Sequence, residues 1–200
     1  MGRIVVTEFV SLDGVMEDPG GSEHSKHGAW TFKFSRGDEG DKFKFDEVNN
    51  AEAQLLGRVT YEGFAQAWPK RSGDPFSAKF NSMPKYVVSS TLKKADWNNS
   101  TILKGNVVDE VSKLKQRIKG DILVSGSARL AQTLIENDLV DQLNLMVFPV
   151  LLGSGKRLFG ETSSMKTLRL VESKTVGDGV SIQVYKPAGE ECRQTADEST

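Results

Sequence analysis

Residues 122–130 read Ile122-Leu123-Val124-Ser125-Gly126-Ser127-Ala128-Arg129-Leu130 and join a strand pattern to a helix pattern. Its first three residues are the apolar run of a buried strand, and a tight Ser-Gly-Ser turn then leads directly into a helical pattern. A strand that ends at the N-terminus of a helix presents consecutive backbone N–H groups to an anion, with no large side chain in the way. Taken alone this motif is a weak signal, and it predicts a strand end suited to an anion.

Strand and helix patterns alternate on both sides of this stretch. Short β-branched and aromatic runs predict strands, apolar residues at helical spacing predict helices, and Asn106 is the expected N-cap of one helix. Alternation followed by a terminal hairpin predicts a mostly parallel central sheet with antiparallel C-terminal strands and flanking helices. The expected strands are 3–11, 54–57, 85–89, 121–124, 142–150, 168–176 and 180–185, and the expected helices are 38–53, 60–67, 107–118 and 127–137.

Length and composition indicate one globular domain. The chain has 200 residues, 38% of them hydrophobic and 26% charged. We expect the domain to cover residues 1–186 and a polar, acidic tail over 187–200 to be disordered. Residues 12–28 are rich in glycine and polar side chains, so we expect a long loop of the kind that often serves as a functional lid.

Charge and cysteine content exclude several classes of partner. The formal net charge of −1 gives no reason to expect nucleic acid or an anionic membrane surface as a partner. No apolar run is long enough to predict a transmembrane helix, and the single cysteine, Cys192, favours a reducing, cytoplasmic setting. His24 and His27 are too few for a metal site without cysteines beside them, so we expect no metal.

The strand expected at 54–57 ends with residues that suit a phosphorylated ligand. Ligands of open α/β sheets bind beyond the carboxyl ends of the strands. Gly57 permits close backbone approach, Arg58 can place two donors on a phosphate, and Thr60 adds a hydroxyl in the first helical turn. The same residues also fit a plain structural role, in which Gly57 eases packing, Arg58 is solvated and Thr60 caps the helix.

Two further strand ends carry small polar residues. Ser89 and Ser90 follow the next strand, although hydroxyls at a strand end, taken alone, are more often turn formers. The third strand end is the turn of the opening stretch, where the candidate ligands are the backbone and side chains of Val124, Ser125, Gly126, Ser127 and Ala128. Together the three ends predict one phosphate-binding edge of the sheet.

These motifs resemble those of a known superfamily. Leu56-Gly57-Arg58-Val59-Thr60-Tyr61-Glu62 is similar to the Gly-Arg-x-Thr segment of dihydrofolate reductases, and the serine pair and glycine turn follow in the same order. Ser11-Leu12-Asp13-Gly14 and Leu139-Val140-Asp141-Gln142-Leu143 resemble the reductase domain of the bifunctional riboflavin-biosynthesis deaminase–reductase. The resemblance covers about residues 2–186. It implies a dihydrofolate reductase-like fold, closest to stand-alone relatives of that riboflavin domain.

The resemblance also implies a cofactor. NADPH is expected along the sheet edge, with Arg58, Ser89 and Ser90 around its 2′-phosphate. One departure is that the family arginine after the glycine turn matches Ala128, while Arg129 is displaced by one position, about 100° around a helix. In dihydrofolate reductases the turn contains a non-proline cis peptide bond, and the corresponding bond here is Ser125–Gly126.

The substrate side offers several candidates and no clear choice. The related enzymes use a carboxylate early in the helix before the Gly-Arg strand, for which Asp41 fits by distance from Gly57 and Asp46 by helix register. Asp38, Glu39 and Glu47 are also eligible, and such a group is commonly just a solvated helix face. Asp13 is expected near the nicotinamide or as a turn-shaping residue. Trp30 is expected to stack on a substrate ring or to lie in the core.

The function expected from the resemblance is an NADPH-dependent reductase of a small heterocyclic or carbonyl substrate. The nearest activity is that of 5-amino-6-(5-phosphoribosylamino)uracil reductase of riboflavin biosynthesis. A non-catalytic NADP-binding sensor on the same fold and a dihydrofolate reductase are the alternatives. Relatives often pair through edge strands, so we also expect a homodimer.

Overall fold

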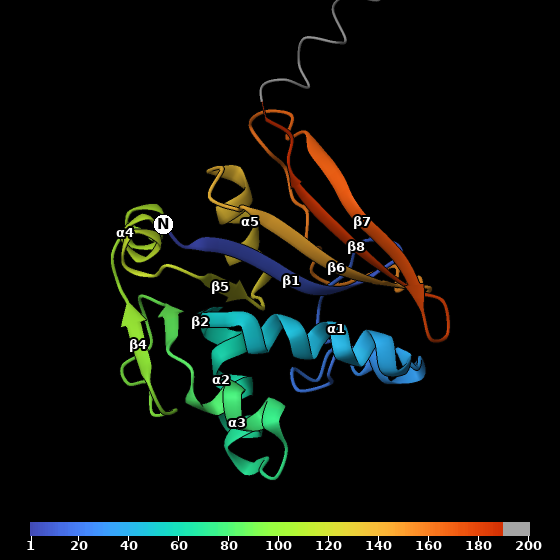
Figure 1. Cartoon of the computed structure of the whole chain (residues 1–200), viewed down its shortest axis with the longest axis horizontal. Coiled ribbons are helices and arrows are strands. Elements are labelled where there is room, and N and C mark those ends of the chain that lie inside the picture. The colour runs from blue at the N-terminus through green and yellow to red at the C-terminus, as the bar shows by residue number, and fades with distance from the viewer. Residues whose placement is uncertain (190–200) are drawn as a thin grey trace, which may run out of the picture.

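The computed structural model describes residues 1–189, which build an eight-stranded sheet with helices on both faces (Figure 1). The strand order is β4-β3-β2-β5-β1-β6-β8-β7. Every pair from β4 through to β6 is parallel, and β8 and β7 then add antiparallel strands. The predicted sheet is therefore confirmed. The strands are β1 Arg3–Ser11, β2 Ala51–Gly57, β3 Lys85–Val88, β4 Ser100–Leu103, β5 Asp121–Val124, β6 Gln142–Phe148, β7 Leu168–Val176 and β8 Val180–Pro187.

Five α-helices and two short 3-10 helices connect the described strands. All four predicted helices are present with shifted ends, and Asn106 caps α4 as expected, accepting from the N–H groups of Val108 and Asp109. Strand β4 and helix α3 were not predicted, because each is short and gives too few residues to show a period. The helices are η1 Trp30–Lys33, α1 Gly37–Asn50, α2 Arg58–Ala67, η2 Trp68–Lys70, α3 Pro75–Ser82, α4 Val107–Arg117 and α5 Ala128–Glu136.

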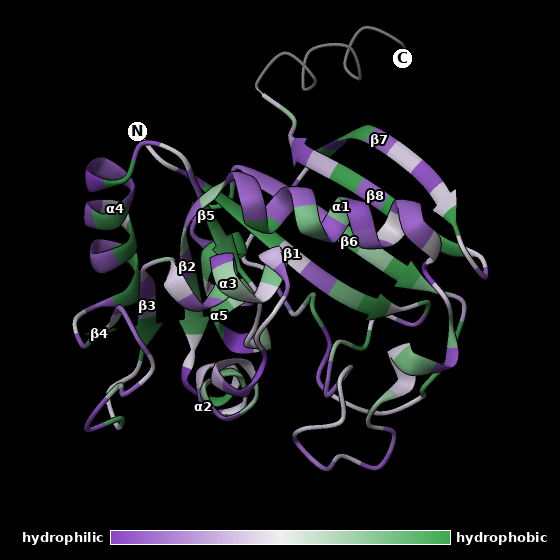
Figure 2. Cartoon of the chain, turned by 60° about the horizontal axis from the view of Figure 1, so that its bottom comes forward, coloured by the Kyte–Doolittle hydropathy of each residue, from purple (hydrophilic) through white to green (hydrophobic). Residues whose placement is uncertain are grey.

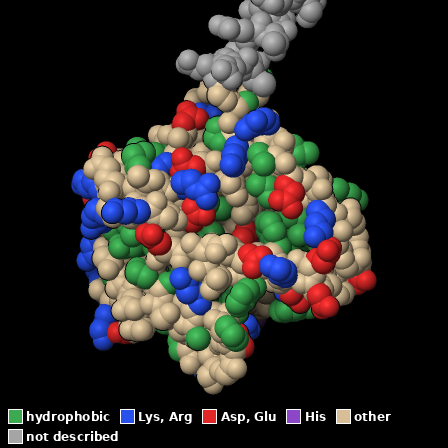
Figure 3. All heavy atoms as spheres, viewed as in Figure 1, with side chains coloured by type: hydrophobic (Ala, Val, Ile, Leu, Met, Phe, Trp, Pro, Cys, Tyr) green, Lys and Arg blue, Asp and Glu red, His purple; other side chains and the backbone are tan. Residues whose placement is uncertain are grey.

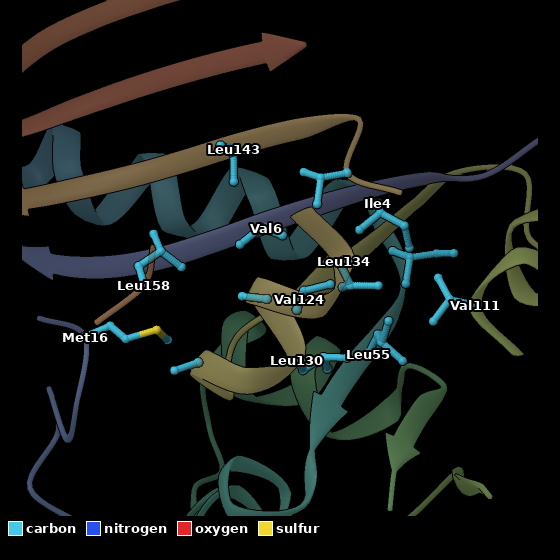
Figure 4. Close-up of a cluster of buried hydrophobic side chains, with 14 of the residues drawn as sticks. Ile4, Val6, Met16, Leu55, Val111, Val124, Leu130, Leu134, Leu143 and Leu158 are labelled. Carbon is cyan, nitrogen blue, oxygen red and sulfur yellow. The ribbon is translucent and has the colours of Figure 1, made fainter. Parts of the chain in front are cut away.

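Both faces of the central strands are buried, and alternate side chains serve opposite faces. Ile4 and Val6 of β1 lie in the cluster that includes α4 and α5, whereas Val5 lies in the cluster that includes α1, α2 and α3. Figure 4 shows the first of these clusters, in which Leu130 and Leu134 of α5 lie close to Val124 of β5. Coloured by hydropathy, the central strands are mostly green while α4 is largely purple (Figure 2). The carboxyl ends of the strands are thus held by packing on two sides.

The C-terminal hairpin has its own small core and an exposed edge. Phe148 and Ile182 pack with Trp30 beneath the hairpin. Strand β7 is the last of the sheet, and its Leu168, Leu170 and Val171 side chains are exposed. The expected pairing of two copies through an edge strand stays a prediction.

The first residues of the tail expected over 187–200 are ordered, so that expectation is wrong for Pro187 and Ala188. Strand β8 includes Pro187, and the N–H of Ala188 donates to the carbonyl of Thr167. The rest of the expected tail, 190–200, lies outside the described residues. Within residues 1–189 no helix has the length and apolar character needed to cross a bilayer.

A buried lysine ties the neighbouring segments together at the start of β3. Lys85 is fully buried, and its ammonium group donates to the carbonyls of Asn81, Met83 and Asn98 at 2.7, 2.8 and 3.0 Å. The same nitrogen lies 4.2 Å from the centroid of the Trp97 ring. Because the three carbonyls come from α3, from the segment before β3 and from the segment before β4, this one side chain joins all three.

We expect Lys85→Met to destabilise the protein by about 2–4 kcal/mol, because the three carbonyl groups would stay buried without a donor. Urea unfolding followed by circular dichroism measures the change. Lys119→Met, at an exposed lysine, is the matched control and should change stability by less than about 0.5 kcal/mol. A loss equal to that of the control would contradict the structural role of Lys85.

Candidate functional site

A cavity of about 1640 Å³ opens at the carboxyl ends of the parallel strands. Its lining includes Glu8 of β1, Gly57 of β2, Ser89 after β3 and Ser125 after β5. It continues along α1, α2 and α3. Pockets for single small ligands are commonly about 300–1,000 Å³, so this cavity has room for two ligands side by side.

The ends of β2 and β5 approach closely at two glycines. The N–H of Gly57 donates to the carbonyl of Gly126 at 3.2 Å. A Cβ added to Gly57 would collide with the Ser127 side chain, and one added to Gly126 would lie 2.6 Å from Oγ1 of Thr60. Gly126 also has a φ of +77°, which strongly favours glycine. We call this close approach the glycine cradle, made of Gly57, Thr60, Gly126 and Ser127.

The cis peptide bond expected in the turn lies one residue later than predicted. It joins Gly126 to Ser127, whereas the resemblance placed it at Ser125–Gly126. The expectation for Ser125–Gly126 is therefore wrong.

The helices that follow the cradle begin without side-chain caps. Neither Gly57, at the start of α2, nor Ser127, at the start of α5, makes a side-chain capping hydrogen bond, whereas α3 is capped by Asp74 and α4 by Asn106. The first turns of both uncapped helices line the cavity. Their unpaired N–H groups and positive dipole ends make this region suited to an anion.

Nine of the ten residues expected to bind the cofactor line this cavity. Val124 does not, because its side chain is fully buried in the core. Arg58 is ion-paired with Glu62 at 2.8 Å, and Ser89 shapes its own turn by accepting from the N–H groups of Thr91 and Leu92. The lining residues are Gly57, Arg58, Thr60, Ser89, Ser90, Ser125, Gly126, Ser127 and Ala128. Arg129, which is displaced by one position from the arginine of the related enzymes, also lines the cavity.

Glu8 is a site residue that sequence reasoning missed. Its side chain accepts a hydrogen bond from the N–H of Gly126 at 2.5 Å, directly behind the cradle. Burial raises the pKa of Glu8 to about 8, although the Gly126 N–H and the nearby charge of Lys44 act in the opposite direction. The carboxyl group is therefore mostly protonated at neutral pH. The available signal was the pair Thr7-Glu8, two polar residues inside an otherwise apolar strand run.

Glu47 is the enclosed carboxylate of α1. Its oxygens accept from Oγ1 of Thr7 at 2.8 Å and from Nδ2 of Asn144 at 2.7 Å, and they pair with Nζ of Lys44 at 2.6 Å. Lys44 also donates to the hydroxyl of Thr7. The Glu47 side chain is 6% exposed, and Thr7, Lys44 and Glu47 all line the cavity.

Asp41 and Asp46, the carboxylates preferred from the sequence, are not enclosed in the way that Glu47 is. Asp41 lines the cavity but is 64% exposed and pairs with Arg36 at 2.6 Å. Asp46 pairs with Lys42 on the helix surface at 2.5 Å and does not line the cavity. The geometry therefore favours Glu47 over Asp41 and Asp46 as the carboxylate of the site.

Asp13 and Trp30 hold loops rather than line the cavity. Hydrogen bonds from the hydroxyl of Ser11 and the N–H groups of Leu152 and Gly153 lower the pKa of Asp13 to about 2. Trp30 is 1% exposed, contacts Phe148 edge-on at 5.3 Å and donates from Nε1 to the carbonyl of Glu17. Its ring is therefore unavailable for stacking on a ligand.

The loop over residues 12–28 is folded against the cavity mouth. The buried carboxylate of Asp18 accepts from the N–H groups of Glu23 and Ser25, both at 2.9 Å. Lys156 pairs with Glu17 at 2.6 Å and with Glu23 at 3.2 Å. Asp18, Glu17 and Glu23 line the cavity, so this loop forms part of its wall. In residues 1–189 no group of three His, Cys, Asp or Glu is arranged to hold a metal ion.

Comparison with known proteins decides the family. Residues 3–182 match the family model described as the RibD C-terminal domain. The chain belongs to the RibD C-terminal domain family. This RibD-type chain is 32% identical over 188 residues to the Bacillus subtilis protein named as uncharacterized protein YyaP, covering 92% of this chain and 94% of YyaP. It is 29% identical over 184 residues to uncharacterized protein YwjB of the same organism, covering 92% and 98% of the two chains.

Solved structures confirm the dihydrofolate reductase-like fold of this RibD-type chain. A putative riboflavin biosynthesis protein from Shewanella superposes with a TM-score of 0.75 at 22% identity, covering 93% of this chain and 99% of that one. Dihydrofolate reductase from Enterococcus faecalis, complexed with NADP(H) and RAB-propyl, superposes with a TM-score of 0.59 at 16% identity, covering 92% of this chain and 96% of that one. A pyrimidine reductase-like protein from Corynebacterium diphtheriae superposes with a TM-score of 0.59 at 15% identity, covering 94% of this chain and 92% of that one. Membership of the RibD C-terminal domain family indicates a reductase-type protein.

We expect Glu8→Gln to change how stability depends on pH. A carboxyl group whose pKa is raised on folding holds its proton in the native state while the unfolded chain releases it, so native stability falls as pH rises from about 4.5 to about 8. This contribution, on the order of a few kcal/mol, should be absent from Glu8→Gln. The measurement is urea unfolding of both proteins at pH 5 and pH 8. Parallel pH profiles would show that Glu8 does not titrate in this way.

Proposed function

We propose that the protein is an NADPH-dependent reductase that transfers hydride to a small heterocyclic or carbonyl substrate. The observation that carries the proposal is the glycine cradle with two uncapped helix N-termini beside it. Backbone N–H groups without large side chains in front of them suit a pyrophosphate, and a Cβ at Gly57 or Gly126 would collide with Ser127 or Thr60 and distort the cradle. Membership of a reductase-like family supports the same assignment.

Residues around the cradle favour NADPH over NADH. Arg58, Ser90 and Lys104 line the same part of the cavity, at the ends of β2, β3 and β4. An arginine beside small hydroxyl groups can bind the extra 2′-phosphate through charge-assisted hydrogen bonds. Glu62 competes for Arg58 in the free protein, and because that ion pair is half exposed, breaking it costs little.

The chain itself can hold and move the proton that accompanies hydride transfer. NADPH supplies the hydride when bound. Glu8 is mostly protonated at neutral pH behind the cradle, and Lys44, Thr7 and Glu47 form a hydrogen-bonded chain on the cavity wall. These groups are our candidates for the proton donor in place of Asp41 and Asp46.

The phosphoribosylamino-pyrimidine of riboflavin biosynthesis is the phosphorylated substrate to test, because the structural neighbour from Shewanella is named as a putative riboflavin biosynthesis protein. Dihydrofolate and a panel of small carbonyl compounds should be tested beside it. NADPH oxidation followed at 340 nm reports turnover. NADPH binding without oxidation in any of these assays would favour the non-catalytic alternative.

We expect Arg58→Ala to weaken NADPH binding about tenfold to a hundredfold and to leave NADH binding nearly unchanged. The reason is that the lost charge-assisted contact, worth roughly 1.5–3 kcal/mol, involves only the 2′-phosphate. Calorimetric titration with both dinucleotides measures the difference. Arg169→Ala removes an exposed arginine on β7, outside the cavity, and should leave both affinities unchanged. Equal weakening of NADPH and NADH by Arg58→Ala would refute this role.

A further inference from the structure

The far end of the cavity, away from the cradle, is walled by aromatic side chains. Phe64 of α2, Trp68 of η2, and Phe76 and Phe80 of α3 all line the cavity. Trp68 and Phe80 are 4.4 Å apart between ring centroids, and Phe76 is stacked on Phe80 at 5.6 Å. Phe64, Trp68 and Phe76 are only half-buried, so their rings keep surface that faces the cavity. We call this end the aromatic chamber.

Helix α1 supplies the polar side of the aromatic chamber. Val48 lies in the same cluster as Phe80, and Lys44 precedes it by one helical turn, so both lie on one face of α1. An ammonium group has three donors. The donors of Lys44 reach Glu47 and the hydroxyl of Thr7, and the ammonium group lies 5.1 Å from the centroid of the Phe9 ring. One donor is thus outside these hydrogen bonds and can reach an acceptor on a ligand.

The two ends of the cavity differ in the charge of the side chains that line them. The cations of α1 and its N-cap that line the cavity are each neutralised by a carboxylate, Arg36 by Asp41, Lys42 by Asp46 and Lys44 by Glu47. Lys104 and Arg129 line the opposite end, and neither has a carboxylate within 4.0 Å among residues 1–189. Excess positive charge is therefore concentrated near the cradle.

One exposed cation stands at the rim of the chamber. Arg71 lies over the Trp68 ring at 4.5 Å from its centroid. This position satisfies the guanidinium by a cation–π contact, and it extends the flat aromatic wall. A single rim cation next to four aromatic rings does not make a phosphate site comparable with the cradle.

We propose that the aromatic chamber takes an unphosphorylated, planar aromatic or conjugated carbonyl compound, with its ring against Phe64, Trp68 and Phe76 and its carbonyl oxygen accepting from Lys44. Flat apolar rings bury well against half-exposed aromatic side chains. The third donor of Lys44 selects an oxygen acceptor and not a cation. That this compound is the substrate rests on the proposed reductase function, whereas the binding itself does not.

The test uses a neutral probe of this class, 2-acetylnaphthalene, and uridine 5′-monophosphate as the phosphorylated comparison. Calorimetry is carried out on the full chain with and without saturating NADPH. Quenching of tryptophan fluorescence, measured in the wild type and in Trp68→Phe, gives a local readout, because the difference between the two signals comes from Trp68. We expect 2-acetylnaphthalene to bind in both conditions. We expect the NADPH-saturated protein to bind uridine 5′-monophosphate at least tenfold more weakly than it binds 2-acetylnaphthalene.

Variants locate the probe. Phe64→Ala and Phe76→Ala should each weaken 2-acetylnaphthalene about fivefold or more, and Lys44→Met should also weaken it, with NADPH affinity unchanged. Phe76→Leu keeps an apolar side chain without the ring, so it should weaken the probe even if Phe76→Ala folds poorly. Phe159→Ala removes an exposed phenylalanine outside the cavity and is the control.

Three results would overturn the proposal: no binding of 2-acetylnaphthalene, binding that none of the Phe64 and Phe76 variants weakens, or displacement of the probe by NADPH. Stronger binding of uridine 5′-monophosphate than of the probe in the NADPH-saturated protein would also overturn it. Failure of the proposed function has a different signature. In that case the wild-type protein would not bind NADPH, while 2-acetylnaphthalene would still bind and respond to Phe64→Ala.

Discussion

The close approach of β2 and β5 at Gly57 and Gly126 is the constraint on which the rest of the site depends. The N–H of Gly57 donates to the carbonyl of Gly126, and the N–H of Gly126 donates to Glu8, so the turn is held from both sides. A side chain at either glycine would push the two strand ends apart. Because α2 and α5 begin at this point, their N-terminal N–H groups open onto the same cavity.

This arrangement gives the large cavity two chemically different ends. At the cradle, backbone donors lie beside Arg58, Lys104 and Arg129, and this end is suited to an anion. Towards α3, ion pairs cancel the charge of α1 and aromatic rings form the wall. Over the face seen in Figure 3, acidic and basic side chains are interspersed, in keeping with a formal net charge of −1. Selectivity in this account therefore comes from local pairing of charges and not from the overall charge of the chain.

Local patterns in the sequence predicted the sheet and most of the residues that line the cavity at its carboxyl edge. The Ser-Gly-Ser turn, the Gly57-Arg58 strand end and the Asn106 cap are short-range signals, because each depends on residues that adjoin in the chain. Strand β4 was missed because its four residues are too few to show an alternation of apolar and polar side chains. The short helix α3 was missed for the same reason, although Asp74 before Pro75 is a start signal.

The substrate side was not predictable in the same way. Glu47 owes its enclosure to Thr7 and Asn144, which lie 40 and 97 residues away in the chain, and no local pattern encodes those contacts. Asp41 and Asp46 sit on the same helix and read alike in sequence, yet their side chains pair at the surface. Trp30 shows the same limit, since packing against Phe148 decides its role.

Diffraction from crystals of the full chain soaked in NADPH shows whether the glycine cradle binds the pyrophosphate of the cofactor. We expect electron density for the pyrophosphate within hydrogen-bonding distance of backbone N–H groups in the first turns of α2 and α5. The aromatic chamber should stay free of the dinucleotide. Pyrophosphate density against any other part of the cavity, with no density at the glycine cradle, would show that the cradle is not the pyrophosphate site.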